Sequence, residues 1–139
     1  MRELPRQLST EELTPLFSGR TRLVDELASR ENPLESAEEI ALALPEEDQV
    51  AALATHPRIG EPSAEQRGAE PEVLAELALL NDEYERRFGF SFVVFVDGRT
   101  RSELVPVLRA RLARTREEEL QAGLRALCKI ARDRWTRTT

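Results

Sequence analysis

Signals that start helices dominate this sequence. In a capping box, Ser or Thr is followed three residues later by Glu, and each side chain bonds the other residue's backbone amide. Four such pairs precede stretches with helical apolar spacing: Ser9/Glu12, Ser36/Glu39, Thr100/Glu103 and Thr115/Glu118. Pro45 and Pro71 mark two further starts, because a first-turn proline loses no helical hydrogen bond. The signals predict helices over residues 10–18, 22–29, 37–44, 46–54, 71–88, 101–114 and 116–135.

Two places interrupt this helical pattern. Pro106 falls inside the sixth predicted helix, so that helix either starts nearer Ser102 or bends at the proline. Residues 89–98 are aromatic and β-branched and end in Asp-Gly, which is typical of a buried strand, but no convincing second strand could pair with them. We therefore predict an all-α fold of about seven helices in a single compact domain over residues 1–139, with a buried non-helical connector near residues 89–98. At least six helices and no sheet of three or more strands are expected.

Composition argues against several classes of protein. With 20 basic and 26 acidic side chains the net charge is −6, so no general basic field would attract nucleic acid. No apolar run approaches the ~20 residues of a membrane helix, and the first ten residues lack a signal-peptide core. The single cysteine, Cys128, excludes an intrachain disulfide and fits a reducing compartment. One histidine and one cysteine also argue against a His/Cys zinc site. We expect a soluble, cytoplasmic protein without a metal.

Two predicted helices carry a polar residue on an apolar face. Asn81 lies one turn after Leu77 in the helix over 71–88, where its amide either bonds nearby backbone or serves a function. Arg134 lies three residues after Ala131 and shares the apolar face of the helix over 116–135. A guanidinium there needs an anion or several acceptors to offset its desolvation, unless it extends past the helix end into solvent.

His56 is the only histidine, and Pro57 moves it away from helical dihedral angles, so it should lie just past a helix end. Imidazole is the side chain best suited to move protons near neutral pH, although a lone histidine can equally be structural or exposed. The following stretch, 56–71, is the only long loop-like region. Within it, Ser63-Ala64-Glu65-Gln66 can act as a fifth capping box.

Four motifs in a fixed order carry a family resemblance: His56-Pro57-Arg58-Ile59-Gly60, then Ser63…Glu65-Gln66, then Asn81-x-x-Tyr84-x-x-Arg87-Phe88-Gly89-Phe90, then Lys129-Ile130-x-x-x-Arg134. Together they resemble the 2-oxo-4-hydroxy-4-carboxy-5-ureidoimidazoline (OHCU) decarboxylases. The resemblance implies an all-helical, homodimeric, cofactor-free enzyme that forms (S)-allantoin late in the oxidation of uric acid. The substrate's carboxylate lies beside a ring C=N that takes up the electrons released with CO2, so the protein supplies binding, orientation and protons.

The resemblance also implies roles for individual residues. His56 matches the catalytic proton donor, Glu65 matches its acidic partner, and Arg134 matches a third catalytic residue near the C-terminus. The positions that match or line the substrate site are Pro57, Ser63 and Gln66, with the backbone of Phe92, Val93, Val94, Phe95 and Val96. The expected ligand is a small ureidoimidazoline, with no nucleic acid or membrane as partner.

One motif departs from the family pattern. The family commonly has Ser-x-x-Glu-Gln, which is one residue shorter here. One deletion on a helix turns a side chain by about 100°, so Ser63 and Glu65 cannot both keep the family's positions unless the helix start shifts. We favour Glu65 and Gln66, since their pair is intact, and expect Ser63 to be chiefly a helix cap; Glu61 is the nearest rival acid. The alternative to an enzyme is a non-enzymatic helical interaction module, in which His56 and Arg134 would lie far apart.

Overall fold

The computed structural model describes residues 3–59 and 70–137. Within these ranges the chain forms seven α-helices and one 3-10 helix and contains no strand, which confirms the all-α prediction. In chain order the elements are α1 (Thr10–Leu13), η1 (Thr14–Phe17), α2 (Arg22–Ala28), α3 (Pro33–Ala43), α4 (Glu46–Ala54), α5 (Pro71–Phe88), α6 (Arg101–Leu112) and α7 (Arg116–Arg137). None of these helices is long and apolar enough to cross a membrane.

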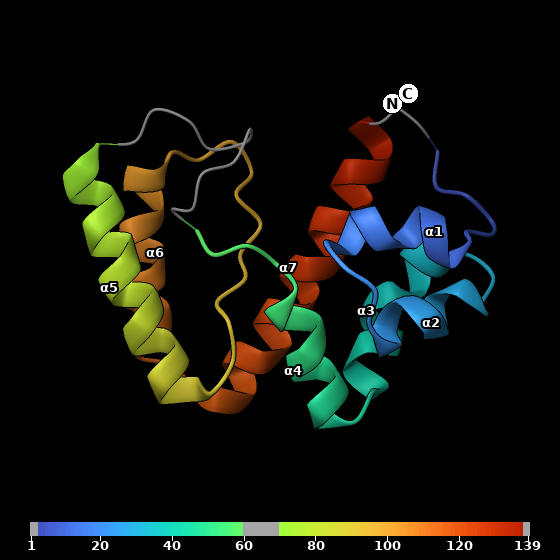
Figure 1. Ribbon diagram of the computed structural model, residues 1–139, viewed down its shortest axis with the longest axis horizontal. Coiled ribbons are helices and arrows are strands. Elements are labelled where there is room, and N and C mark those ends of the chain that lie inside the picture. Colours follow the sequence, from blue (N-terminus) through green and yellow to red (C-terminus); the bar gives the residue numbers. More distant parts are fainter. Residues whose placement is uncertain (1–2, 60–69, 138–139) are drawn as a thin grey trace.

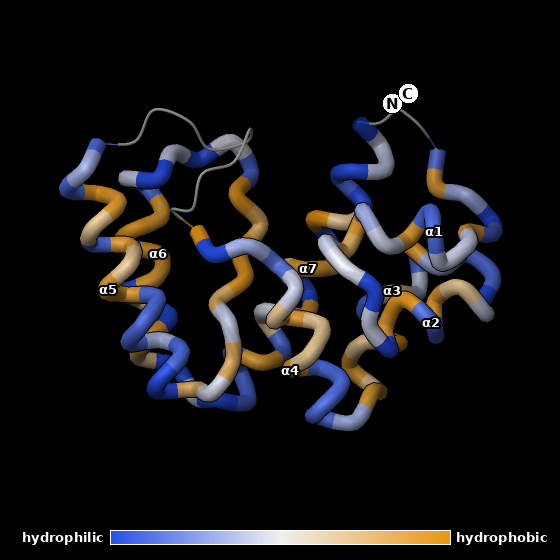
Figure 2. Tube along the Cα trace, viewed as in Figure 1, coloured by the Kyte–Doolittle hydropathy of each residue, from blue (hydrophilic) through white to orange (hydrophobic). Residues whose placement is uncertain are grey.

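The long helix α7 crosses the middle of the molecule and packs against η1, α3 and α4 on one side (Figure 1). On the other side, α5 and α6 pack against each other and run in the same direction (Figure 1). Parallel neighbours cannot be joined by a tight turn, so the chain between them returns along their length. Figure 2 shows that this return segment is largely apolar, as a buried connection must be.

The return segment confirms the predicted connector. Gly89 ends α5 in the left-handed conformation (φ 82°), and Asp97 and Gly98 turn the chain with φ of 50° and 75°. Between these turns Phe90, Phe92, Val93 and Val94 are buried, and the rings of Phe90 and Phe92 lie 6.0 and 5.1 Å from that of Tyr84 on α5. The segment is held by side-chain packing and needs no partner strand.

Most of the predicted helix starts are confirmed. Reciprocal capping boxes form at Ser9/Glu12 and Thr100/Glu103, and Thr115 and Glu118 exchange the same two hydrogen bonds. The start at Ser36 was predicted wrongly: α3 begins at Pro33, whose fixed φ is already suited to a first turn. The predicted helix over 10–18 divides into α1 and η1, and α6 continues from Arg101 through Pro106.

A buried polar cluster joins α5, α6 and α7. The carboxylate of Glu119 is fully buried and accepts hydrogen bonds from the Tyr84 hydroxyl at 2.8 Å and from Arg111 Nε at 2.7 Å. Arg114 lies 3.4 Å from its other oxygen, and the Arg111 guanidinium stacks 4.7 Å from the centre of the Phe92 ring. Burial and the bond to Glu119 raise the pKa of Tyr84, so the phenol remains a donor.

Candidate functional site

His56 lies just past the end of α4, as predicted. The helix ends at Ala54, and the backbone amide of His56 still donates to the carbonyl of Leu53 at 3.3 Å. The side chain is partly buried, and its Nδ1 atom is buried without a hydrogen-bond partner in the part of the chain that the structure describes. Burial, with a smaller contribution from the positive charge of Arg134, lowers the pKa of His56 from 6.5 to about 4. The imidazole of the free protein is therefore neutral at neutral pH.

Arg134 reaches the same region from α7. Its Nη1 donates to the carbonyl oxygens of Pro15 and Leu16 at 3.2 and 3.1 Å and to Ser18 Oγ at 2.8 Å. These acceptors lie at the C-terminal end of η1, where a helix leaves carbonyl groups without helical partners. The guanidinium thus finds several acceptors, one of the two alternatives that the sequence left open. Its charge lies near enough to His56 to affect the imidazole.

Residues 55–59, which we call the His56 segment, are fixed at both ends. At one end the Thr55 hydroxyl shares its hydrogen between the carbonyls of Phe17 at 3.0 Å and Ala52 at 2.9 Å, so this end contacts the same 3-10 helix that holds Arg134. At the other end the segment contacts α5: Arg58 pairs with Asp82 at 2.7 Å and Glu85 at 2.9 Å. The segment therefore bridges the two sides of the molecule (Figure 1).

Asn81 provides a second attachment of the His56 segment to α5. Its side chain is 1% exposed, and Nδ2 donates to the carbonyl of Ile59 at 3.1 Å and to that of Leu77 at 2.9 Å. The first bond crosses to the His56 segment, and the second joins successive turns of α5. The interpretation that this amide bonds nearby backbone is therefore confirmed.

The connector backbone is already partly engaged. Arg99 donates to the carbonyls of Phe95 and Val96 at 2.6 and 3.0 Å, and Arg111 Nη1 lies 3.4 Å from the carbonyl of Val93. Three carbonyls of the segment 92–96 therefore accept hydrogen bonds from the protein itself. That this backbone contacts a ligand stays a prediction. Since three of the carbonyls are already engaged, we expect the contacts to come chiefly from the backbone amides.

The remaining predicted site residues divide into two groups. Pro57 is exposed, directly after His56. Ser63, Glu65 and Gln66, with the rival acid Glu61, lie outside the described residues. In the described ranges, no group of three or more His, Cys, Asp or Glu residues could hold a metal ion. The structure thus brings His56 and Arg134 together and leaves the acidic partner untested.

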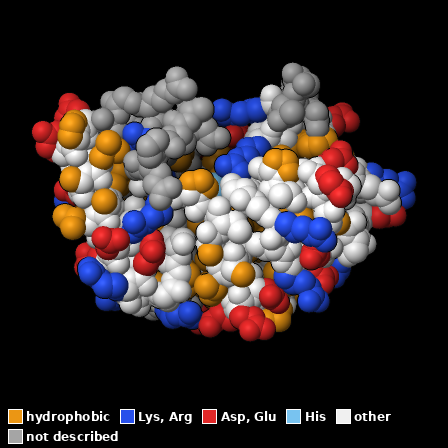
Figure 3. Space-filling view, viewed as in Figure 1, with side chains coloured by type: hydrophobic (Ala, Val, Ile, Leu, Met, Phe, Trp, Pro, Cys, Tyr) orange, Lys and Arg blue, Asp and Glu red, His pale blue; other side chains and the backbone are white. Residues whose placement is uncertain are grey.

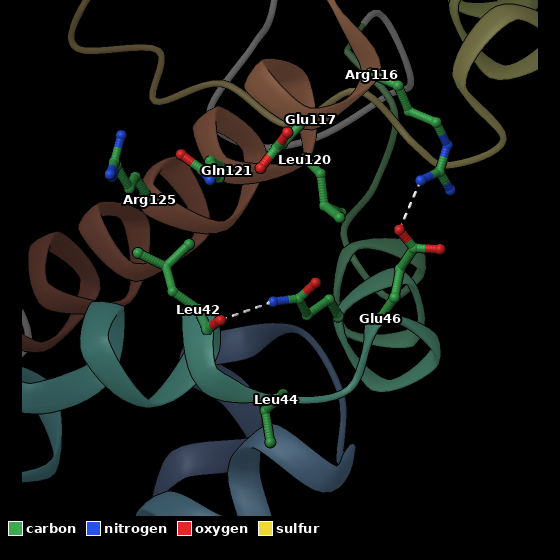
Figure 4. A pocket seen from close by; sticks show the side chains of 9 residues that line it. Leu42, Leu44, Glu46, Arg116, Glu117, Leu120, Gln121 and Arg125 are labelled. Atoms are coloured by element: carbon green, nitrogen blue, oxygen red, sulfur yellow. Dashed lines mark hydrogen bonds and ion pairs between the residues drawn. The ribbon is translucent and has the colours of Figure 1, made fainter.

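A groove of about 590 Å³ lies elsewhere, where the end of α3 meets the beginnings of α4 and α7 (Figure 4). Leu42, Leu44 and Leu120 contribute apolar walls, and Arg116 pairs with Glu46 at 2.7 Å. None of the predicted site residues that the structure describes lines this groove. It is therefore separate from the candidate site.

The sequence reasoning missed the residues that hold His56 in place. Asp82 and Glu85 are spaced three apart on α5, a spacing that places two carboxylates on one helix face, and this was the only available signal. Nothing local indicates that Arg58, 24 and 27 residues away, fills the space between them. Thr55 gives no signal either, because its partner belongs to η1.

Comparison with known proteins decides the family. A family model described as OHCU decarboxylase matches residues 3–136. The chain belongs to this family. The uric acid degradation bifunctional protein PucL of Bacillus subtilis (strain 168) is 35% identical over 107 residues, which cover 68% of this chain and 22% of that protein. The chain thus spans less than a quarter of the length of this relative.

Two crystal structures resemble the fold. The structure of an OHCU decarboxylase in the presence of (S)-allantoin matches with a TM-score of 0.75 and 25% identity, covering 84% of this chain and 89% of that chain. The structure of an (S)-allantoin synthase matches with a TM-score of 0.68 and 20% identity, covering 94% of this chain and 50% of that chain. The helical architecture is therefore that of the OHCU decarboxylase family.

As a test of the electrostatics in this member of the OHCU decarboxylase family, we expect His56 to titrate at about pH 4 in the free protein. Because the chain has one histidine, the Hε1 proton of its ring gives one assignable NMR signal that can be followed against pH. Arg134→Met should raise the midpoint only slightly, since burial is the larger cause of the lowered pKa. A wild-type midpoint at 6.5 or above would contradict the buried, neutral imidazole.

The same titration has a consequence for stability. Above pH 6.5 the imidazole is neutral in both the folded and the unfolded chain, and its contribution to the free energy of unfolding is constant. Between 6.5 and about 4 the unfolded chain binds a proton that the folded chain does not. The free energy of unfolding therefore decreases as the pH falls through this range, because protonation of His56 favours the unfolded chain. His56→Asn should make this part of the urea-unfolding profile flatter.

Proposed function

We propose that this chain is a cofactor-independent OHCU decarboxylase, a carboxy-lyase that forms (S)-allantoin in uric acid degradation. Family membership over residues 3–136 supports the assignment. The observation that carries it is that one 3-10 helix, η1, holds both Arg134, through the carbonyl of Leu16, and the His56 segment, through the bond from Thr55 to Phe17. Under the alternative of a helical interaction module Arg134 and His56 would have no reason to meet.

The charges of the site suit an anionic substrate. Arg134 offers positive charge beside His56, and Lys and Arg side chains gather in the upper middle of the face seen in Figure 3. A carboxylate held next to the imidazole favours the protonated ring, because an opposite charge within ~4–6 Å stabilises the charged form. Binding of the substrate would thus shift His56 from the neutral state of the free protein towards the imidazolium that donates a proton.

The chemical step then needs no group from outside the protein and substrate. The bond between the ring carbon and the carboxylate breaks, CO2 leaves, and the electron pair moves into the adjacent C=N. His56 supplies the proton that the former imine carbon takes up, so delivery to one face fixes the (S) configuration. The hydroxyl on the neighbouring carbon becomes a carbonyl as its proton passes to the ring nitrogen, so the net uptake is one proton for each CO2 released. We assign Glu65 as the acid that orients His56 or returns a proton to it. The residues assigned as substrate contacts are Pro57, Ser63 and Gln66, with the backbone amides of residues 92–96.

The resemblance extends the proposal to the setting of the enzyme. Residues 1–139 act as one domain, in the cytoplasm, as a homodimer that binds a small ureidoimidazoline. The single cysteine is typical of proteins in reducing compartments. The net charge of −6 supports a partner other than nucleic acid.

The direct test uses freshly generated substrate and the purified chain. Substrate loss is followed by absorbance and the handedness of the product by circular dichroism, against a reaction without protein, because the substrate also decays by itself. Formation of (S)-allantoin faster than this background supports the proposal. Racemic product at the background rate contradicts it.

A paired substitution tests which acid assists His56. Glu65→Gln keeps the shape and removes the carboxylate, so it should lower the rate by about 10²-fold or more without a comparable change in melting temperature. Glu61→Gln makes the same chemical change four residues earlier and should leave the rate unaltered. Full activity of Glu65→Gln together with inactivity of Glu61→Gln would show that the neighbouring acid had been assigned wrongly.

A further inference from the structure

The placement of His56 depends on its two chain neighbours. Pro57 follows it directly, and the pyrrolidine ring fixes one dihedral angle and restricts those of His56 itself. Little rotational freedom therefore separates the imidazole from the attachments at Arg58 and Ile59. A displacement of these residues relative to α5 must be transmitted to His56.

Of the attachments to α5, the bond from Asn81 is the buried one. The Arg58 guanidinium is about one-third exposed, at 32%, and its partners Asp82 and Glu85 are 55% and 38% exposed. Solvent and salt weaken ion pairs of this kind. Asn81 is 1% exposed, so its bond to the Ile59 carbonyl is protected from water.

Asn81 is also unfavourable for stability in one respect. Its Oδ1 atom is buried and has no hydrogen-bond partner in the described part of the chain. Leu77, Tyr84 and Phe88 are buried on the same helix, so a leucine at position 81 would continue the apolar face and leave no such atom. Packing alone would thus favour a leucine at this position.

We propose that Asn81 is a positioning residue that sets the location of His56 relative to Arg134 through the carbonyl of Ile59. The other end of the His56 segment is attached by Thr55 to η1, which also holds Arg134. The Asn81 bond fixes the remaining end to α5. The expected change in kcat rests on the proposed function. The expected change in the position and burial of His56 does not.

The experiment compares Asn81→Leu with a matched control, Gln49→Met. Gln49 is likewise a buried amide, 8% exposed, and its Nε2 donates to two backbone carbonyls, those of Ala41 and Leu42, at 3.0 and 3.2 Å. Asn81→Leu keeps the number and branching of the non-hydrogen side-chain atoms, and Gln49→Met replaces the amide by an unbranched thioether of similar length. Both substitutions remove two side-chain hydrogen bonds. Only Asn81 bonds the His56 segment, so any general cost of losing a buried amide appears in both variants.

We expect Asn81→Leu to lower kcat by about 10–100-fold, because small misplacements of a reacting group are costly, with KM changed less than about threefold. The NMR titration midpoint of His56 should rise from about 4 towards 6.5 as the imidazole loses its burial. Gln49→Met should leave both quantities at their wild-type values. Unchanged kcat and midpoint in Asn81→Leu, or equal losses in both variants, would overturn the inference.

Further variants keep the test decisive if Asn81→Leu does not fold. Arg58→Met removes the exposed attachment to α5 and should shift the His56 midpoint in the same direction by a smaller amount. Its control is Arg109→Met. Arg109 of α6 pairs with Glu76 of α5 at 2.7 Å, so this substitution also removes an ion pair to α5, but one that does not involve the His56 segment. Because the Asn81 bond remains in Arg58→Met, the decisive fallback is Asn81→Ala, which removes both side-chain hydrogen bonds without adding atoms. An unaltered His56 midpoint in Asn81→Ala would contradict the inference. If the wild type lacks decarboxylase activity, the proposed function fails, while the titration still tests whether Asn81 positions His56.

Discussion

We expect His56→Asn to lower the rate of the proposed decarboxylation by about 10²–10⁴-fold, because a proton can no longer be delivered by a positioned imidazole. The fold should remain, since the side chain lies past the end of α4 and is only partly buried. Asparagine retains a polar group of similar reach without a titratable nitrogen. The rate is measured as loss of freshly generated substrate above the background without protein.

Two controls make this result interpretable. The far-ultraviolet circular dichroism and melting temperature of His56→Asn should match those of the wild type near neutral pH, where the imidazole is uncharged in the folded protein. The residual rate should depend less on pH than that of the wild type. Near-normal turnover in the variant would exclude His56 as the proton donor.

The second large effect is on stability and concerns Glu119. Glu119→Ala should lower the free energy of unfolding by about 3–5 kcal/mol, because it leaves the guanidinium of Arg111 buried without its charged partner. Arg111 is only 11% exposed, and the Tyr84 hydroxyl would lose its acceptor as well. Urea unfolding followed by circular dichroism measures the change.

The chain supplies a matched control for this substitution. Arg116 and Glu46 also form an arginine–glutamate pair of 2.7 Å, but these side chains are 45% and 59% exposed. Glu46→Ala should therefore cost no more than about 1 kcal/mol. If the two substitutions had equal effects, burial would not govern the strength of these pairs. Replacing Arg111 and Glu119 together by leucine should recover part of the loss, because no unpaired charge then stays buried.

Local signals predicted the parts of the fold that local interactions create. The capping boxes at Ser9, Thr100 and Thr115 formed because each involves residues within one turn. Ser36 failed because Pro33, three residues earlier, is already a suitable first residue of the helix. The connector was recognisable from its composition and its closing turn. Its packing on Tyr84 was not, because that contact depends on how α5 and the returning chain meet.

The candidate site shows the same division. Periodicity placed Arg134 on the apolar face of α7, but its acceptors at Pro15 and Leu16 lie more than a hundred residues earlier, and no local pattern links them. Glu119 was not recognised because its local pattern is an ordinary one. It belongs to a run of three glutamates in the first turn of α7, where acidic residues are ordinary, and only the packed structure shows that this one is fully buried.

The bonds from Arg134 to η1 also bear on when the site can form during folding. They close a loop of 119 residues to Pro15, whereas α1, α2 and α3 contact their immediate neighbours in the chain. Closing a long loop costs more chain entropy than closing a short one, and contacts between distant residues form more slowly. We therefore expect that the contacts among α1, α2 and α3 can form before α7 docks, and that Arg134 and His56 meet only when it does. In a partly folded chain the only histidine would then lack the guanidinium beside it. The proposed activity would therefore appear only once folding is complete.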